Sequence, residues 1–99
     1  MLRGAEDDAL NLFVSISNRS EEEAVRFSDA LDQASHALSQ FPELGSRFMG
    51  RHRRKLVIGF YDYGVFYSIE GERVVVQASM NLRQNPEQIR GRLGESSAG

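Results

Sequence analysis

Apolar positions in the first half of the chain recur every three or four residues, the spacing of an amphipathic helix. Residues 5–17 form one such stretch, with the acidic residues 6–8 in its first turn, where the helix dipole favours negative charge. A second stretch starts at Ser20, which is predicted to form a capping box with Glu23, and it stops before Pro42. Its apolar positions are Ala24, Phe27, Leu31, Ala34, Leu38 and Phe41. The pattern predicts two helices joined by a short turn, which pack as an antiparallel hairpin.

From Lys55 onward the period changes to two, the spacing of half-buried β-strands. We expect three strands, with two-residue hairpin turns at Tyr61-Asp62 and Glu70-Gly71. This register pairs Phe60 with Tyr63, Ile69 with Glu72, Tyr67 with Val74 and Val65 with Val76. The side chains then expected to face the helices are Leu56, Ile58, Phe60, Tyr63, Val65, Tyr67, Ile69, Val74, Val76, Ala78 and Met80. The opposite face is expected to carry Lys55, Val57, Gly59, Gly64, Phe66, Ser68, Arg73, Val75, Gln77 and Ser79.

A short final helix is predicted after the third strand, with Asn85 as its cap, Pro86 as its first residue and Gly94 at its end. The whole outline is an α+β fold, in which the N-terminal helical hairpin packs on a three- or four-stranded antiparallel sheet. A chain of 99 residues builds one hydrophobic core, so we expect a single domain over residues 1–94. Residues 95–99 are expected to form a disordered tail.

Charge is distributed unevenly along the chain, whose net charge is −2. Residues 1–45 contain three basic and nine acidic side chains, whereas residues 46–99 contain nine basic and five acidic ones. The second half could therefore bind an anionic partner, although a solvated charged surface is the commoner cause of such a split. The densest basic run is Arg51, His52, Arg53, Arg54 and Lys55, which is either a binding patch or a solvated loop that enters a strand.

Several chemistries lack the residues that they need. There is no cysteine, which excludes a disulfide framework, a thiolate zinc site and a cysteine nucleophile. His36 and His52 do not have the spacing of metal ligands, and we expect neither a metal nor a cofactor. Tyr63 and Tyr67 fall on the core side of the predicted sheet, which favours hydrogen-bonded core tyrosines over catalytic ones. The apolar runs are much shorter than the ~20 residues of a membrane span, and residues 1–3 open no signal peptide, so we expect a cytoplasmic protein without a membrane partner.

The predicted outer face of the sheet carries an apolar cluster around Phe66, flanked by Val57 and Val75. One explanation is that the final helix folds back over this cluster through Ile89 and Leu93. The other is that a partner segment docks on it. Of the two, we favour partner docking.

Four runs, in this order and spacing, carry a family resemblance: residues 41–45 (FPELG), 53–57 (RRKLV), 65–72 (VFYSIEGE) and 83–86 (RQNP). Together they resemble the RelE/ParE superfamily of toxins from bacterial toxin-antitoxin modules. The resemblance covers nearly the whole chain. It implies a cognate antitoxin as partner, and a homodimer or a toxin-antitoxin heterotetramer as the assembly. Family members usually have an additional strand before the first helix, which is shortened or missing here.

The superfamily has two activities, cleavage of messenger RNA on the ribosome by RelE-like members and poisoning of DNA gyrase by ParE-like members. Lys55 matches a basic position of the RNA-cleaving branch, and Arg83 matches an arginine after the last strand. Val57 stands where a second lysine can occur, Gly64 replaces an arginine that grips phosphate, and Asn81 stands where many relatives have a histidine. These departures remove groups that would stabilise the transition state or transfer a proton. The resemblance therefore favours the ParE-like branch.

We accordingly expect a ParE-like toxin that binds and inhibits DNA gyrase and is neutralised by its antitoxin. The residues expected to bind the antitoxin or the target are Arg51, Arg53, Arg54, Lys55, Val57, Phe66, Val75, Asn81 and Arg83. One alternative is a RelE-like mRNA endoribonuclease, whose partners would be the ribosome and mRNA. Another is a non-toxic, toxin-like binding module.

Overall fold

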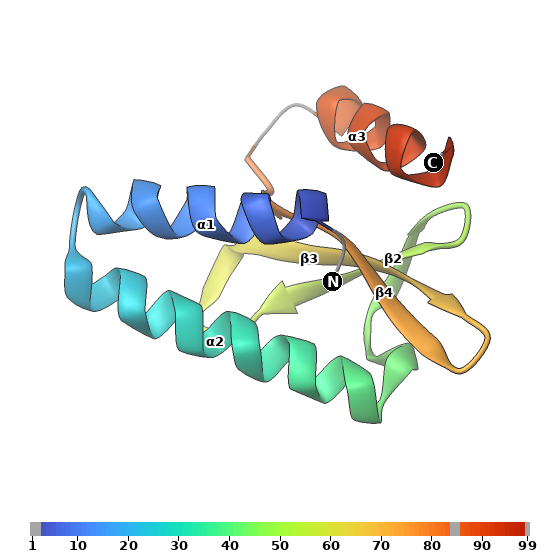
Figure 1. The fold of residues 1–99 in the computed structure, drawn as a ribbon, viewed down its shortest axis with the longest axis horizontal. Helices are drawn as coiled ribbons and strands as arrows, with labels where there is room; N and C mark the ends of the chain where they lie inside the picture. The colour runs from blue at the N-terminus through green and yellow to red at the C-terminus, as the bar shows by residue number, and fades with distance from the viewer. Residues whose placement is uncertain (1–2, 84–85, 99) are drawn as a thin grey trace.

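The computed structural model describes residues 3–83 and 86–98 and contains the α+β fold that the sequence predicts (Figure 1). Its helices are α1 (Arg3–Ser17), α2 (Glu21–Gln40), the short 3-10 helix η1 (Pro42–Leu44) and α3 (Pro86–Ala98). Its strands are β1 (Ser46–Met49), β2 (His52–Val57), β3 (Phe60–Glu70) and β4 (Arg73–Asn81), which form one antiparallel sheet in that spatial order. Among the described residues no strand precedes α1, and the fourth strand is β1, which the alternation pattern did not reveal.

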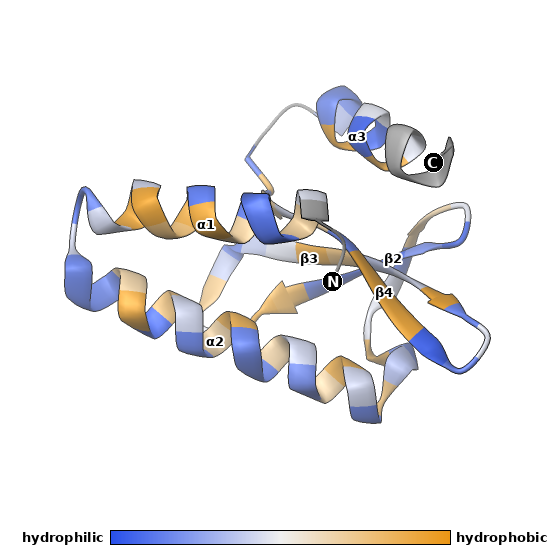
Figure 2. Ribbon diagram, viewed as in Figure 1, coloured by the Kyte–Doolittle hydropathy of each residue, from blue (hydrophilic) through white to orange (hydrophobic). Residues whose placement is uncertain are grey.

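The helical hairpin forms as predicted, with apolar and hydrophilic residues in alternating bands along α1 and α2 (Figure 2). Ser20 caps α2, because its Oγ accepts a hydrogen bond from the Glu23 N–H at 3.2 Å. The reciprocal bond of a capping box, in which the Glu23 side chain would accept the Ser20 N–H, is replaced, because this N–H donates to the Ile16 carbonyl at 2.9 Å. The predicted apolar stripe is buried at Ala24, Phe27, Leu31, Ala34 and Leu38. Phe41 lies beyond the helix and is 63% exposed.

The β2–β3 hairpin turns at Ile58-Gly59, so the predicted turn at Tyr61-Asp62 is wrong. Gly59 has a φ of +85°, which glycine adopts without steric penalty. Lys55 consequently lies opposite Val65 instead of Ser68, a register shift by an odd number of residues. Such a shift sends every side chain of a strand to the other face. The predicted outward orientation of Lys55 and Val57 is therefore wrong, and Val57 is buried in the core beneath the helices.

The β3–β4 hairpin turns at Gly71-Glu72, one residue later than predicted, with Gly71 at a φ of +65°. This change keeps Tyr67 and its new partner Val76 on the helix side, as predicted. A bulge at Gln77 then adds one residue to β4 and reverses the faces of the residues that follow. The predicted core positions Ala78 and Met80 lie on the outer face for this reason.

Both faces of the sheet are buried. The inner cluster, beneath α1 and α2, contains Ala5, Ile16, Ala24, Phe27, Leu31, Leu38, Val57, Val65, Tyr67 and Val76. The outer cluster, beneath α3, contains Phe66, Ala78, Met80, Ile89 and Leu93. Phe66 is thus covered by the final helix through Ile89 and Leu93, and the interpretation of this cluster as a partner docking site is wrong. Helix α3 also continues past the predicted end at Gly94, so residues 95–98 belong to it, while Asn85, the predicted cap, lies outside the described residues.

A partly buried ion pair joins α3 to α1. Asp8 accepts hydrogen bonds from Arg92 Nη1 at 2.9 Å and from Arg92 Nη2 at 2.8 Å, and it also accepts the Ser79 N–H of β4 at 3.2 Å. Arg92 Nη2 donates in addition to the Gly4 carbonyl at 3.2 Å. The two termini of the domain are therefore joined through one carboxylate.

Tyr67 connects the sheet to η1, which confirms it as a hydrogen-bonded core tyrosine. Its buried hydroxyl donates to the Pro42 carbonyl at 2.6 Å and accepts the Gly45 N–H at 2.9 Å. A Cβ at Gly45 would lie 2.6 Å from the Tyr67 hydroxyl oxygen, so only glycine fits this approach. The hydroxyl thereby sets the path of the chain between α2 and β1.

We predict that Tyr67→Phe lowers the free energy of unfolding by about 1–3 kcal/mol, because it leaves the Gly45 N–H and the Pro42 carbonyl without this partner. Urea denaturation monitored by circular dichroism measures the change. Tyr61→Phe is the matched control, since Tyr61 is 63% exposed and should change stability by less than about 0.5 kcal/mol. Equal midpoints for both variants would contradict the prediction.

Candidate functional site

The nine predicted site residues do not form one surface. Lys55 and Val57 lie on the helix side of the sheet, and Arg54, Phe66 and Val75 lie on the outer face. Arg51 and Arg53 lie near the β1–β2 turn, whereas Asn81 and Arg83 lie at the opposite end of the long strands. Each region therefore has to be considered by itself.

Lys55 lies beside α2, in a groove of about 220 Å³ that it lines with Ile58 and with Ala30, Gln33, Ala34 and Ala37 of the helix. Its ammonium donates to the Leu56 carbonyl at 3.1 Å. Strand β1 begins at Ser46, opposite Arg54, and so it does not extend to Leu56. Lys55 therefore covers an open stretch of the β2 edge and does not face the position of Gly64.

The outer face around Gly64 is filled by neighbouring side chains. The Arg54 guanidinium lies 5.7 Å from the centre of the Phe48 ring, and that ring packs edge-on against Phe66 at 5.1 Å. A Cβ at Gly64 would lie 3.1 Å from Leu82 and 3.3 Å from Arg54. Arg54 is therefore a packing residue as well as a charge, and this face holds no open phosphate site around Gly64.

Asn81 and Arg83 line a polar pocket of about 270 Å³. Arg83 pairs with Asp62 at 2.9 Å, and the Asn81 Oδ1 accepts the Arg83 N–H at 2.9 Å. Both members of the ion pair are more than half exposed, so their attraction contributes at most about 1 kcal/mol. The other lining residues are Arg19, Glu23, Gly59, Phe60, Tyr61 and Tyr63. The pocket balances basic with acidic groups, which differs from a site built to concentrate positive charge.

Positive charge gathers instead around the β1–β2 turn. Arg47, Arg51 and Arg53 line a pocket of about 210 Å³, here named the basic pocket, together with Gly50, His52 and Ile69. Arg51 forms an exposed ion pair with Glu70 at 3.4 Å. Arg53 Nη1 donates to the Gly45 carbonyl at 3.0 Å, which holds its charge beside the end of η1. Two of the predicted binding residues, Arg51 and Arg53, thus share a concave surface.

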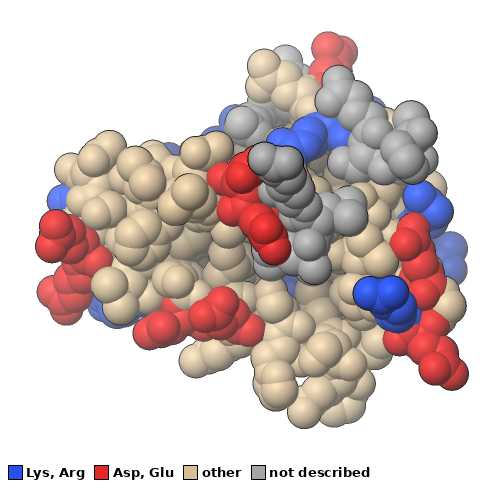
Figure 3. Space-filling model, viewed as in Figure 1, with Lys and Arg blue, Asp and Glu red and all other residues tan. Residues whose placement is uncertain are grey.

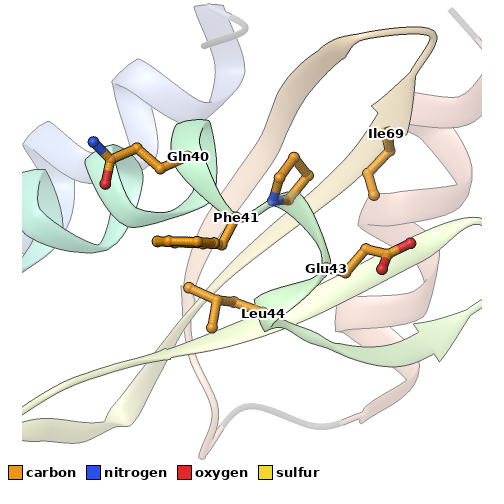
Figure 4. Close-up of a pocket in the computed structure, with 6 residues that line it drawn as sticks. Gln40, Phe41, Glu43, Leu44 and Ile69 are labelled. Atoms are coloured by element: carbon orange, nitrogen blue, oxygen red, sulfur yellow. The ribbon is translucent and has the colours of Figure 1, made fainter.

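An apolar groove of about 560 Å³ adjoins the basic pocket (Figure 4). It is lined by Gln40, Phe41, Pro42, Glu43, Leu44 and Ile69. Phe41 and Leu44 point to the same side of η1, whereas Glu43 points to the other side, and these two apolar side chains are 63% and 52% exposed. Ile69 lines both the groove and the basic pocket, so the two lie next to each other.

Sequence reasoning missed this combined surface because it assigned Phe41 to the buried stripe of α2 and gave no role to Leu44 or Arg47. The available signal was the position of Pro42. A proline ends the helix, so apolar residues next to it need not follow the helical stripe into the core.

His52 links β2 to α3 beneath the outer cluster and is only 2% exposed. Burial lowers the pKa of its imidazole below the usual 6.5, the Arg51 charge lowers this pKa further, and a hydrogen bond with the Leu93 backbone raises it. The neutral imidazole is therefore the form that the fold favours. His52 is a structural contact to α3 and lies away from the polar pocket of Arg83.

We predict that acid weakens the fold through His52. Because the folded-state pKa is below the unfolded value of 6.5, the stability that neutral His52 contributes is present above pH 6.5 and is lost as the pH falls below it. Urea unfolding at pH 7.5 and pH 5.0 should show a smaller stability loss in His52→Gln than in the wild-type protein. The exposed His36, changed to Gln, is the control; if it alters the pH dependence as much as His52→Gln does, the assignment is wrong.

Residues 3–83 and 86–98 contain neither a cluster of metal ligands nor a helix that could cross a membrane. No three His, Asp or Glu side chains gather there as a metal site would require. No helix in this part of the chain has the length and apolar character needed to cross a membrane.

Comparison with known proteins gives one family. The family model described as the ParE toxin of the type II toxin-antitoxin system, parDE, matches residues 2–84. A search of curated proteins found no match.

Proposed function

The chain belongs to the ParE toxin family of type II toxin-antitoxin systems, and from this membership we propose that it acts by binding and inhibiting DNA gyrase. Membership implies a cognate antitoxin as partner. The proposal concerns the target of the toxin and the surface that the antitoxin occupies.

The observation that carries the choice of gyrase over RNA cleavage is the separation of the basic and titratable groups. RNA cleavage requires a base, an acid and a phosphate-binding charge around one scissile bond. Lys55 lies on the helix side, and Arg83 lies at the end of the sheet in an ion pair with Asp62. His52 is buried beneath α3 with a lowered pKa. These groups cannot meet at a single phosphate without rearrangement of the sheet, which supports action through binding.

The antitoxin, in this proposal, occupies the basic pocket and the adjoining apolar groove. Arg47, Arg51 and Arg53 supply positive charge, and Phe41 and Leu44 supply exposed apolar area next to it. An antitoxin segment with an apolar anchor followed by carboxylates complements this surface. Val57 and Phe66 lie outside this surface because they are buried on the two faces of the sheet, and Lys55 lies outside it in the separate groove beside α2.

The target is tested with purified components and in cells. We predict that the chain inhibits ATP-dependent supercoiling of relaxed plasmid by DNA gyrase in a dose-dependent way, while relaxation by topoisomerase I is unaffected. Induced expression should arrest growth without codon-linked cuts in primer-extension maps of messenger RNA. Such cuts, with gyrase unaffected, would instead indicate a RelE-like endoribonuclease. Normal growth with active gyrase would indicate a non-toxic binding module.

The antitoxin surface is tested by coexpression with the product of the small open reading frame that adjoins the gene. We predict that the double variant Arg47→Glu, Arg51→Glu still arrests growth but is no longer rescued, because reversed charge weakens antitoxin binding by at least about tenfold. Arg90→Glu, on the exposed side of α3, is the matched control and should be rescued like the wild type. Full rescue of the double variant would contradict this proposal and would indicate that the antitoxin binds elsewhere on the toxin.

A further inference from the structure

The basic pocket of about 210 Å³ has three arginines in its lining, and no acidic residue is among its described lining residues. Arg47 comes from β1, Arg51 from the turn that follows and Arg53 from β2. Arg47 and Arg51 are exposed, and Arg53 is held beside the end of η1 by its bond to the Gly45 carbonyl. Guanidinium groups bind the oxygens of carboxylates and phosphates through paired N–H donors, so this pocket suits an oxyanion.

The neighbouring acidic side chains leave most of this charge available. Arg51 pairs with Glu70 at 3.4 Å, but the two side chains are 54% and 43% exposed. An ion pair this exposed contributes at most about 1 kcal/mol, so an oxyanion in the pocket can replace Glu70. Glu43 lines the adjoining apolar groove and not the basic pocket. The pocket therefore attracts anions.

The acidic residues of the helical hairpin lie away from the pocket. The longest axis of the molecule measures 37 Å, and Figure 1 places the turn between α1 and α2 at one end of it and the turn between β1 and β2 near the other. Figure 3 shows acidic side chains over the start of α1 and along α2. At 0.1 M salt the Debye length is about 10 Å, so a ligand in the basic pocket is screened from the acids at the opposite end. The net charge of −2 thus does not prevent an anion from binding here.

We propose that the basic pocket binds the phosphate backbone of duplex DNA when no antitoxin occupies it. This inference rests on the proposed function, because it gives the surface assigned to the antitoxin a second ligand of the same charge. Antitoxin carboxylates and DNA phosphates then compete for Arg47, Arg51 and Arg53. Contact with DNA concentrates the free toxin where gyrase acts, whereas growth arrest under induced expression does not require this contact.

The lining of the pocket favours phosphates over bases and over RNA. Proteins that bind single strands stack the bases on aromatic side chains, and no phenylalanine or tyrosine is among the described lining residues. Recognition of RNA uses the ribose hydroxyl, but the described lining offers no carboxylate or amide side chain to accept its proton. Contacts to phosphate carry no sequence information. We therefore expect binding to duplex DNA without sequence preference.

Salt dependence measures how many phosphates are bound. The test is fluorescence anisotropy of a labelled DNA duplex of about 20 base pairs with the purified toxin, without gyrase, between about 25 and 100 mM KCl. We expect the logarithm of the association constant to fall against the logarithm of the salt concentration with a slope of about −2.7, the value for three phosphate contacts. Affinity should then fall about fortyfold over this range, equally for duplexes of different sequence.

Variants locate the contact. Arg47→Gln and Arg51→Gln should each weaken DNA binding at the lowest salt concentration by about threefold or more and make the slope shallower by about 0.9. Both side chains are exposed, so circular dichroism should show unchanged folding. Arg19→Gln and Arg90→Gln remove exposed arginines outside the pocket and should bind like the wild type.

Three results would overturn the inference: a slope near zero, equal weakening by the control variants, or tighter binding of a single-stranded RNA of the same length. The assay contains no gyrase, which separates this inference from the proposed function. A toxin that inhibits gyrase but does not bind DNA refutes the DNA contact alone. A toxin that binds DNA as expected but leaves gyrase active refutes only the choice of gyrase as target.

Discussion

A single carboxylate connects the helical hairpin, the sheet and the final helix of this molecule. Asp8 of α1 receives both terminal nitrogens of Arg92 from α3 and the main-chain N–H of Ser79 from β4. Its side chain is only 14% exposed, so these charge-assisted bonds are poorly screened by water. Ile89 and Leu93 project from the same helix onto the outer cluster. The position of α3, and with it the burial of the second sheet face, depends on this ion pair.

The covered sheet determines where the protein can interact. Helices lie on both faces of the sheet, so the concave surfaces of the described residues lie at the ends of the strands, beside the β2 edge and on the outside of the helical hairpin. Positive charge and apolar area coincide at the end near η1, whereas negative charge dominates the hairpin. The acidic first half of the sequence and its basic second half thus contribute to different parts of the surface. A toxin arranged in this way presents different chemistry to different partners.

The sequence predicted the helices well and the sheet faces poorly, for physical reasons. Helix limits depend on local signals, such as the cap at Ser20 and the stop at Pro42, and these act within one turn. Hairpin turns could be placed at several positions with similar apolar alternation. The decisive glycines were misassigned, since Gly59 was expected within a strand and Gly71 at the second position of its turn instead of the first. The bulge at Gln77 has no sequence signature, and neither does the pair of Asp8 with Arg92, which lie 84 residues apart. Lys55 and Val57, which were assigned to the site because of the face on which they were expected, therefore lie on the opposite face of the sheet.

Strand β1 is too short to pair with the whole of β2, and the main chain at Leu56 is left at an open edge. Open edges allow the sheets of separate molecules to join and to grow into fibrils. Lys55 opposes this by occupying the Leu56 carbonyl with its own ammonium and by placing a charge where an identical strand would have to align. The lysine that the family resemblance associates with RNA cleavage thus stands at an open sheet edge, where a charged side chain disfavours pairing with another strand.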